Sequence, residues 1–281
     1  MKEIALKIGK PTPLTGIVAT PKEIETDKPA VLILNSGIMH HVGACRLSVK
    51  IARQLARKGV LNIRFDLSGI GDSAPRAGTA SFHETAINEI TEVMDYLEQK
   101  RGIKKFIAYG LCSGADAAYD IALADERIVG IAQIDPYCYR TWSWYVRHYG
   151  PKVFKLRAWL NAIKVRTVEK KDSLGFSKSV PEENLEMPSY IREFPSRESV
   201  ATGMQSLVKR GVHVYSLFTG GQSEILNHQS QFKQSLAAVD FRGLLTVDYV
   251  PDMDHIITAP ALQAYTRDTI CEWVFNQCRP A

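Results

Sequence analysis

The sequence contains no uninterrupted apolar run approaching the ~20 residues needed to span a bilayer. Its first residues, Met1 to Lys7, also lack the apolar core of a signal peptide. The five cysteines, at positions 45, 112, 138, 271 and 278, are odd in number and form no C-x-x-C pair, which argues against a disulfide framework and against a zinc site. These absences predict a cytoplasmic protein with reduced thiols, no metal and no other cofactor.

The chain also lacks a large excess of positive or negative charge. The 35 basic and 30 acidic residues give a net charge of +5 and are spread along the chain, with no basic block beyond Lys170-Lys171. This composition gives no support to nucleic-acid binding. No internal repeat or low-complexity segment is evident, and 281 residues with 45% hydrophobic content suffice for one large domain. We therefore expect a single domain over residues 1–281.

Apolar segments alternate with segments of helical periodicity along most of the chain. Residues 4–8 and 14–18 alternate around a Pro/Gly turn, which predicts an N-terminal β-hairpin. Continuous apolar runs are typical of strands buried on both faces of a parallel sheet. The alternation predicts an α/β fold with a doubly wound, mostly parallel sheet. The expected strands are 30–35, 60–66, 105–109, 128–135, 212–218 and 244–250, and the expected helices are 44–58, 84–100, 115–122, 225–239 and 260–275.

The alternation breaks between about residues 136 and 209. Aromatic and basic residues are interleaved in the first part of this segment, and a polar, proline-bearing stretch follows. Two interpretations remain open, a helical lid insertion over about 138–209 or an amphipathic helix pair packed in the core. A lid would bring an apolar acyl group and its polar or anionic handle to substrate-binding side chains. The candidates are Tyr137, Arg140, Trp144 and Arg147.

The segment Gly110-Leu111-Cys112-Ser113-Gly114 has the form of a nucleophile elbow with cysteine in the place of serine. It stands between an expected strand and an expected helix. Its middle residue would occupy a strained turn, and the glycines would leave room for the strand and helix to pass closely. Centring the motif on Cys112 puts glycines at both flanking positions, whereas centring it on Ser113 puts bulky Leu111 at one of them. Cys112 is therefore the predicted nucleophile, at a helix N-terminus that favours its thiolate.

These features resemble the α/β-hydrolase superfamily over nearly the whole chain. The resemblance rests on Asn35-Ser36-Gly37, on residues 64–73 (RFDLSGIGDS), on the elbow and on Asp254-His255 near the C-terminus. Within the superfamily the chain is similar to serine-aminopeptidase-like hydrolases, including small enzymes encoded beside exosortase systems. A cysteine elbow is also found in dienelactone hydrolases and polyhydroxyalkanoate synthases.

The resemblance implies a role for several residues. Cys112 would attack an acyl carbon, and His255 would take the thiol proton and later return one to the leaving group. The backbone N–H of Ser113, and that of Ile38 or Met39, would form the oxyanion hole. His40 and His41 stand beside this predicted loop and are candidates for substrate contact.

The triad acid departs from the family pattern. The usual strand-Gly-x-x-Asp ending aligns with residues 217–224 and puts Ser223 at the acid position, with Glu224 one residue beyond. Glu224 is slightly preferred, and Asp135, at the end of the strand after the elbow, is the alternative. A third possibility is that no acid is needed, because a thiol of pKa ~8.5 requires far less activation than a hydroxyl.

The predicted function is that of a cysteine-dependent hydrolase or acyltransferase acting on an ester, lactone or thioester. Thiolate attack on an amide is handicapped because sulfur leaves the tetrahedral intermediate more readily than an amine does. The partner would be a small-molecule acyl donor, free or carried by coenzyme A or an acyl carrier protein. The alternative is a non-catalytic binding protein that keeps the hydrolase fold.

Overall fold

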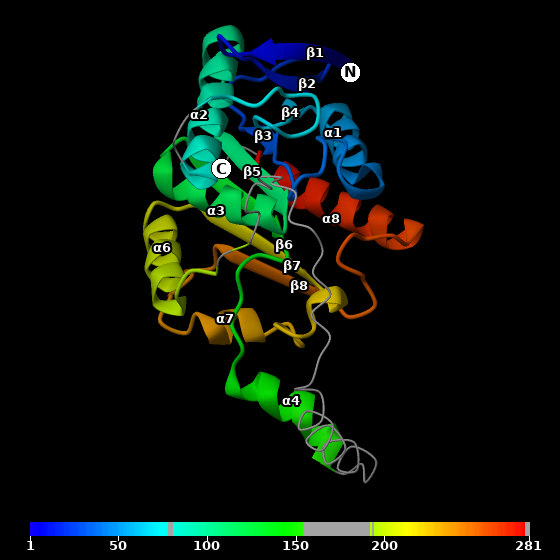
Figure 1. Ribbon diagram of the computed structural model, residues 1–281, viewed down its shortest axis with the longest axis vertical. Helices are drawn as coiled ribbons and strands as arrows, with labels where there is room; N and C mark the ends of the chain where they lie inside the picture. The colour runs from blue at the N-terminus through cyan, green and yellow to red at the C-terminus, as the bar shows by residue number, and fades with distance from the viewer. Residues whose placement is uncertain (78–80, 154–191, 193, 279–281) are drawn as a thin grey trace, which may run out of the picture.

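The computed structural model describes residues 1–77, 81–153, 192 and 194–278 and contains an eight-stranded sheet (Figure 1). The strand order is β1-β2-β4-β3-β5-β6-β7-β8. The first two strands form an antiparallel hairpin, β2 pairs antiparallel with β4, and every other neighbouring pair is parallel. The strands are β1 (Lys2–Ile8), β2 (Leu14–Thr20), β3 (Ala30–Ile33), β4 (Asn62–Phe65), β5 (Phe106–Leu111), β6 (Ile128–Ile134), β7 (His213–Thr219) and β8 (Leu245–Val250).

Helices cover both faces of the sheet, so β3, β4 and β5 are buried throughout. The core on one face includes residues of α2 (Phe82–Arg101), α3 (Ser113–Ala124) and α6 (Arg197–Lys209). The core on the other face includes residues of α1 (Leu47–Arg57) and α8 (Pro260–Gln277). Short 3₁₀ helices span Ala44–Arg46 and Gly220–Gln222. The structure thus confirms the doubly wound, mostly parallel sheet and its N-terminal hairpin.

The sequence explains why helix α2, which packs against α3, begins and ends where it does. Ser81 and Glu84 form a capping box at the start of α2, and Gly102, with φ of 71°, ends the helix. Between them, the predicted apolar stripe packs on the sheet and includes the buried residues Ile90, Met94 and Leu97.

The predicted helix over 225–239 is wrong in its extent, because only α7 (Gln231–Ser235) is helical there. The buried Gln231 side chain accepts a hydrogen bond from the Asn227 N–H and donates one to the carbonyl of Ile225. Such local hydrogen bonds between side chain and backbone compete with the regular backbone hydrogen bonds of an α-helix. The segment therefore folds as turns around Gln231.

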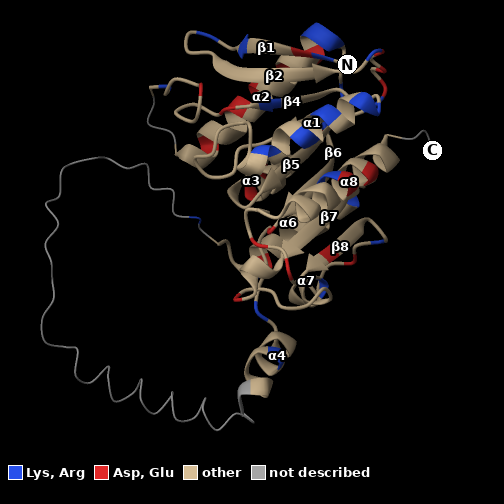
Figure 2. Ribbon diagram, turned by 90° about the vertical axis from the view of Figure 1, so that its right-hand side faces the viewer, with Lys and Arg blue, Asp and Glu red and all other residues tan. Residues whose placement is uncertain are grey.

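Part of the predicted lid belongs to the main fold. Helix α6 lies inside the predicted 138–209 insertion, yet its residues Val200, Met204 and Leu207 are buried in the core with α3. Helix α4 (Trp142–Val153) extends away from the sheet (Figures 1 and 2). Residues 154–191 of the insertion lie outside the described residues, so a lid remains a prediction.

All five cysteines are free, in agreement with the predicted reduced thiols. Within the described residues, no helix combines the length and apolar character needed to cross a membrane. Charged residues of both signs are spread along the described part of the ribbon and do not form one block (Figure 2).

Candidate active site

Cys112 lies between β5 and α3, at the turn that the sequence predicted. Its backbone has φ of 56° and ψ of −120°, a conformation that is strained for a residue with a side chain. Its N–H donates to the Ile134 carbonyl over 2.9 Å, which ties the turn to the end of β6. The thiol stands directly before the first residue of α3, where the helix dipole favours an anion.

The two elbow glycines are required by close backbone contacts. A Cβ at Gly110 would lie 2.1 Å from the Gly114 carbonyl, and a Cβ at Gly114 would lie 2.3 Å from the Asn35 carbonyl. Any larger residue at either position would push α3 away from β5 or from the loop after β3. The predicted reason for the glycines is therefore confirmed.

His255 lies in the loop after β8 and contacts both other members of the site. Its Nδ1 is 2.6 Å from Oδ2 of Asp135, and its imidazole lies close enough to the Cys112 thiol for each group to shift the other's pKa. Because Nδ1 faces the carboxylate, Nε2 is the nitrogen available to the thiol. The structure thus brings Cys112, His255 and Asp135 together, with a direct hydrogen bond between His255 and Asp135.

Asp135 is held at the end of β6 by the end of β7. The Thr219 N–H donates to Oδ1 over 2.8 Å, and the Thr219 hydroxyl donates to Oδ2 over 2.7 Å. The residue has φ of 50° and is 2% exposed, so its carboxylate is both oriented and withdrawn from water. With the imidazole included, the carboxylate takes part in three hydrogen bonds, which fix its orientation toward His255.

Glu224, the acid preferred from the sequence, forms no hydrogen bond or ion pair with His255 in the described structure. Its backbone carbonyl accepts a hydrogen bond from Arg140 Nε over 2.7 Å. In the sequence, Gly220 and Gly221 match the glycine that precedes the triad acid in the family pattern. In the structure, their lack of side chains lets the loop that carries His255 lie against the end of β7. A Cβ at Gly221 would lie 2.5 Å from the backbone nitrogen of His255. A Cβ at Gly220 would overlap the backbone carbonyl of Pro251. The geometry favours Asp135 over Glu224.

Electrostatics in the site favour a thiolate–imidazolium pair. Burial raises the pKa of the Cys112 thiol, but the hydrogen bond from His255, the charge of Arg192 and the Ser113 N–H outweigh it and lower the pKa. The hydrogen bond to Asp135, followed by the one to Cys112, raises the pKa of His255 to about 9. The two groups titrate as a coupled pair. Both shifts favour the ionised form of the nucleophile.

Arg192 is a residue that the sequence analysis missed. Its Nε and Nη2 donate to both oxygens of Asp116, in the first turn of α3, over 2.6 and 2.8 Å. Nη2 also donates to the backbone carbonyl of Asp135 over 3.0 Å. One guanidinium therefore ties the helix that follows Cys112 to the strand end that carries Asp135. No local sequence signal marks it, because the contact joins residues 57 or more positions apart.

We expect Arg192→Gln to raise the pKa of the Cys112 thiol, because it removes a positive charge that stabilises the thiolate. Alkylation of Cys112 by iodoacetamide, followed by mass spectrometry, should then need a higher pH for half-maximal rate. Arg57→Gln, on the exposed face of α1, serves as the matched control. An unchanged pH profile in a folded Arg192→Gln variant would show that this charge does not act on the thiol.

The loop after β3 lies against the elbow as expected for an oxyanion hole. The Gly37 N–H donates to the Ser113 hydroxyl over 2.7 Å. Of the two predicted donors in the loop, the Met39 N–H is used in a turn to the Ser36 carbonyl. The Ile38 N–H has no such partner among the described residues. Ile38 is therefore the better of the two predicted donors in this loop, and the oxyanion hole formed with Ser113 remains a prediction.

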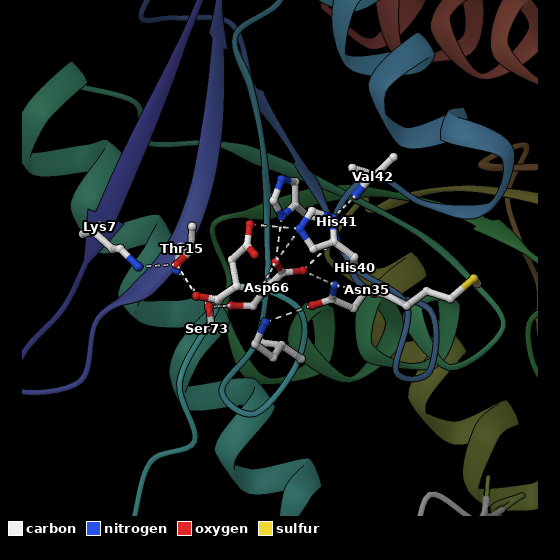
Figure 3. A network of polar contacts seen from close by, with 11 residues as sticks. Lys7, Thr15, Asn35, His40, His41, Val42, Asp66 and Ser73 are labelled. Carbon is white, nitrogen blue, oxygen red and sulfur yellow. Dashed lines mark hydrogen bonds and ion pairs between the residues drawn. The ribbon is translucent and has the colours of Figure 1, made fainter.

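The polar network in Figure 3 holds this loop in place. The fully buried carboxylate of Asp66 accepts from Asn35 Nδ2, the His41 N–H and His41 Nδ1 over 2.6 to 2.9 Å. Asn35 Nδ2 also donates to the Met39 carbonyl. His41 is buried in the network, and His40 Nε2 pairs with Asp72 over 3.0 Å. These contacts make His41 part of the loop support, and substrate contact by either histidine remains a prediction.

The same network gathers four groups that could hold a metal ion, His40, His41, Asp66 and Asp72. The chemistry of His40 does not suit a metal. Its Nδ1 accepts the Val42 N–H over 3.2 Å, so the neutral ring carries its proton on Nε2, the nitrogen that faces Asp72. A metal at Nε2 would need the lone pair that this tautomer lacks. The cluster fits hydrogen bonding better than metal ligation.

The remaining predicted substrate residues lie in different places. Tyr137 lines a cavity that Ser113 and Arg192 also line. The Arg140 guanidinium lies 4.5 Å from the ring centroid of Trp144, whose Nε1 donates to the Ser223 carbonyl. Arg147, on α4, lines a separate hollow with His228 and Arg242. Of the four predicted residues, only Tyr137 lies in a cavity beside the elbow in the described structure.

Comparisons with known proteins agree with the fold. The profile of the family described as serine aminopeptidase, S33, matches residues 26–222. Solved structures that resemble the chain include carboxylesterase CesB of Bacillus subtilis, with 14% identity, a TM-score of 0.59 and coverage of 98% of this chain and 92% of that one. An α/β serine hydrolase without a lid from Xanthomonas campestris has 15% identity and a TM-score of 0.56, with 100% and 97% covered.

A Pyrococcus furiosus esterase has 13% identity and a TM-score of 0.58, with 98% of this chain and 90% of that chain covered. At such identities the likeness is one of fold. A search of the curated proteins found no match. The family profile, however, covers strands β3 to β7, the elbow and Asp135. The eight-stranded sheet, the strained elbow and this profile together show that the chain belongs to the serine aminopeptidase S33 family of α/β hydrolases.

Proposed function

We propose that this protein is a cysteine-dependent hydrolase or acyltransferase that acts on an ester, lactone or thioester. The observation that carries the proposal is the placement of the Cys112 thiol at a strained elbow beside His255, whose Nδ1 is hydrogen-bonded to Asp135. The solved relatives named above are esterases or serine hydrolases, whereas this chain has cysteine at the elbow. The lowered pKa of the Cys112 thiol supports its use as a nucleophile in place of a serine hydroxyl.

In the acylation step, Sγ of Cys112 attacks the acyl carbon and the carbonyl oxygen becomes an oxyanion. The N–H groups of Ser113 and Ile38 would stabilise that charge. When the tetrahedral intermediate collapses, the bond to the leaving group breaks and His255 Nε2 gives it a proton. The products are a thioester on Cys112, the free alcohol or thiol, and a neutral imidazole.

In the second step, the neutral imidazole of His255 takes a proton from water or from another acceptor, whose oxygen, nitrogen or sulfur attacks the thioester carbon. The bond to Sγ then breaks, and the thiolate–imidazolium pair is restored. The thiolate is a better leaving group than an unprotonated amine, so the intermediate from an amide tends to revert unless His255 protonates the amide nitrogen first. Activated acyl donors, free or carried by coenzyme A or an acyl carrier protein, suit this chemistry best.

The test is to trap and divert the acyl-enzyme. We expect incubation with aryl esters and acyl thioesters to add the acyl mass to the peptide containing Cys112, read by mass spectrometry. An added small amine, alcohol or thiol should shift product from free acid to transferred acyl group as its concentration rises. Donor consumption should stay constant if acylation limits the rate, because the acceptor acts after that step.

Two outcomes would change the proposal. Free acid at every acceptor concentration would restrict the protein to hydrolysis. A folded protein with a reactive Cys112 thiol that forms no acyl-enzyme with any activated donor would contradict catalysis and favour a binding protein on the same fold.

A further inference from the structure

A cavity of about 130 Å³ lies between α2 and α3, directly beside the elbow. Its walls include Ser113, the residue that follows Cys112 and is a predicted oxyanion donor, so an acyl group bonded to Sγ would enter this space past Ser113. The two helices pack against each other on one face of the sheet (Figure 1). Six of its lining residues are apolar: Phe82, Ala86, Ile87, Ile90, Ala117 and Tyr137.

The charged groups in the wall of this cavity pair with one another. Arg192 holds Asp116 over 2.6 Å, and His83 Nδ1 lies 3.2 Å from Asp120. Both basic side chains therefore already face an acid, and neither offers an unpaired counter-charge to an anionic acyl group. An ionised acyl group would lose its hydration there without gaining an unpaired counter-charge. An uncharged acyl group avoids that cost.

The size of the cavity limits the acyl group. An apolar cavity of about 150 Å³ is large enough for benzene, whereas sites for drug-sized ligands measure roughly 300–1,000 Å³. The present cavity belongs to the first class. An unbranched chain of roughly six carbons or fewer, or a small ring, would fill it.

We propose that the cavity between α2 and α3 is the acyl-binding pocket and that it selects short, uncharged acyl groups. This inference rests on the proposed function, since it names the acyl group that Cys112 would carry. It differs from the sequence-based expectation, which placed an anionic handle on Arg140 or Arg147. In the structure, neither of these residues lines this cavity.

The experiment compares kcat/KM for p-nitrophenyl esters from acetate to decanoate. We expect the wild-type protein to prefer chains of about two to six carbons and to lose activity on longer chains. Ala117→Leu fills the cavity from α3 and should lower kcat/KM for the hexanoate ester at least ~10-fold relative to acetate, since each excluded methylene costs about 10-fold or more. Ile87→Ala, which enlarges the cavity, should extend the preference to longer chains.

Ala237→Leu is the matched control, because it adds the same atoms in an exposed position that lines different hollows. Its chain-length profile should equal that of the wild type. Retained acetate turnover and thiol alkylation would show that Ala117→Leu is folded and reactive.

An unchanged profile in Ala117→Leu would overturn the pocket assignment while leaving the proposed function standing. Wild-type activity restricted to charged acyl groups or to chains beyond about ten carbons would also overturn it. Failure of the wild-type protein to form an acyl-enzyme with any ester would overturn both inferences.

Discussion

Replacing Cys112 with alanine should abolish turnover, with a fall in kcat on the order of 10⁴-fold or more, because no other group at the elbow can form the acyl bond. Cys112→Ser should have intermediate activity. A serine hydroxyl has a far higher pKa than a thiol and would depend fully on His255 and Asp135 for its activation. The measurement is steady-state hydrolysis of an aryl ester, with the acyl mass on the elbow peptide followed in parallel.

Two further variants make this prediction specific. Cys45→Ala removes an exposed thiol and should leave kcat unchanged. Ser113→Ala keeps the N–H needed for the oxyanion but loses the hydroxyl that accepts from Gly37, so we expect a loss of about 10-fold or less. An inactive Ser113→Ala variant beside an active Cys112→Ala variant would mean that the nucleophile is misassigned.

Asp135→Asn should lower kcat by roughly 10² or more, whereas Glu224→Gln should stay within a few fold of the wild type. The hydrogen bond to Asp135 is the largest cause of the raised pKa of His255. Without the carboxylate, that pKa should fall from about 9 toward its usual range. The imidazolium that stabilises the thiolate would then be lost at a lower pH, and the pKa of the Cys112 thiol should rise.

The pKa shifts of Cys112 and His255 set how alkylation and turnover depend on pH. In the wild-type protein, the rate of Cys112 alkylation should rise as the pH increases through the pKa of the thiol. Because that pKa is lowered, the rise should occur at a lower pH than for an ordinary cysteine. Turnover should then fall as pH rises through about 9, because His255 loses the proton that the leaving group needs. In Asp135→Asn both limbs should shift, the first upward and the second downward.

Circular dichroism must show that both acid variants are folded, since Asp135 also binds the end of β7 through Thr219. Small and equal losses in the two variants would support a dyad of Cys112 and His255 without an acid. A large loss in Glu224→Gln alone would restore the sequence-based preference and contradict the geometry.

The order of strands and helices could be predicted from the sequence because its causes are local. A continuous apolar run such as residues 30–33 has no polar side chain to expose, so it becomes a buried parallel strand. The apolar stripe and caps of α2 likewise lie within one segment. The elbow is local for the same reason, since Gly110 and Gly114 make their close contact across four residues.

The triad acid could not be predicted in this way. Gly220 and Gly221 looked like the approach to a carboxylate, but they serve to let the loop of His255 lie against the end of β7. Asp135 reaches His255 across 120 residues of sequence because β6 and β7 are neighbours in the sheet. Pairing between distant strands decides which carboxylate faces the imidazole, and no local pattern encodes it.

By itself, then, the sequence determined the fold class, the elbow and the pairing of a cysteine with a late histidine, because these depend on apolar periodicity, glycines and chain order. The tertiary structure alone decided the neighbours of that cysteine. Arg192 meets Asp116 and the Asp135 carbonyl, and the cavity between α2 and α3 opens beside Ser113. These contacts join segments far apart along the chain, and only the packing of helices on the sheet brings them together.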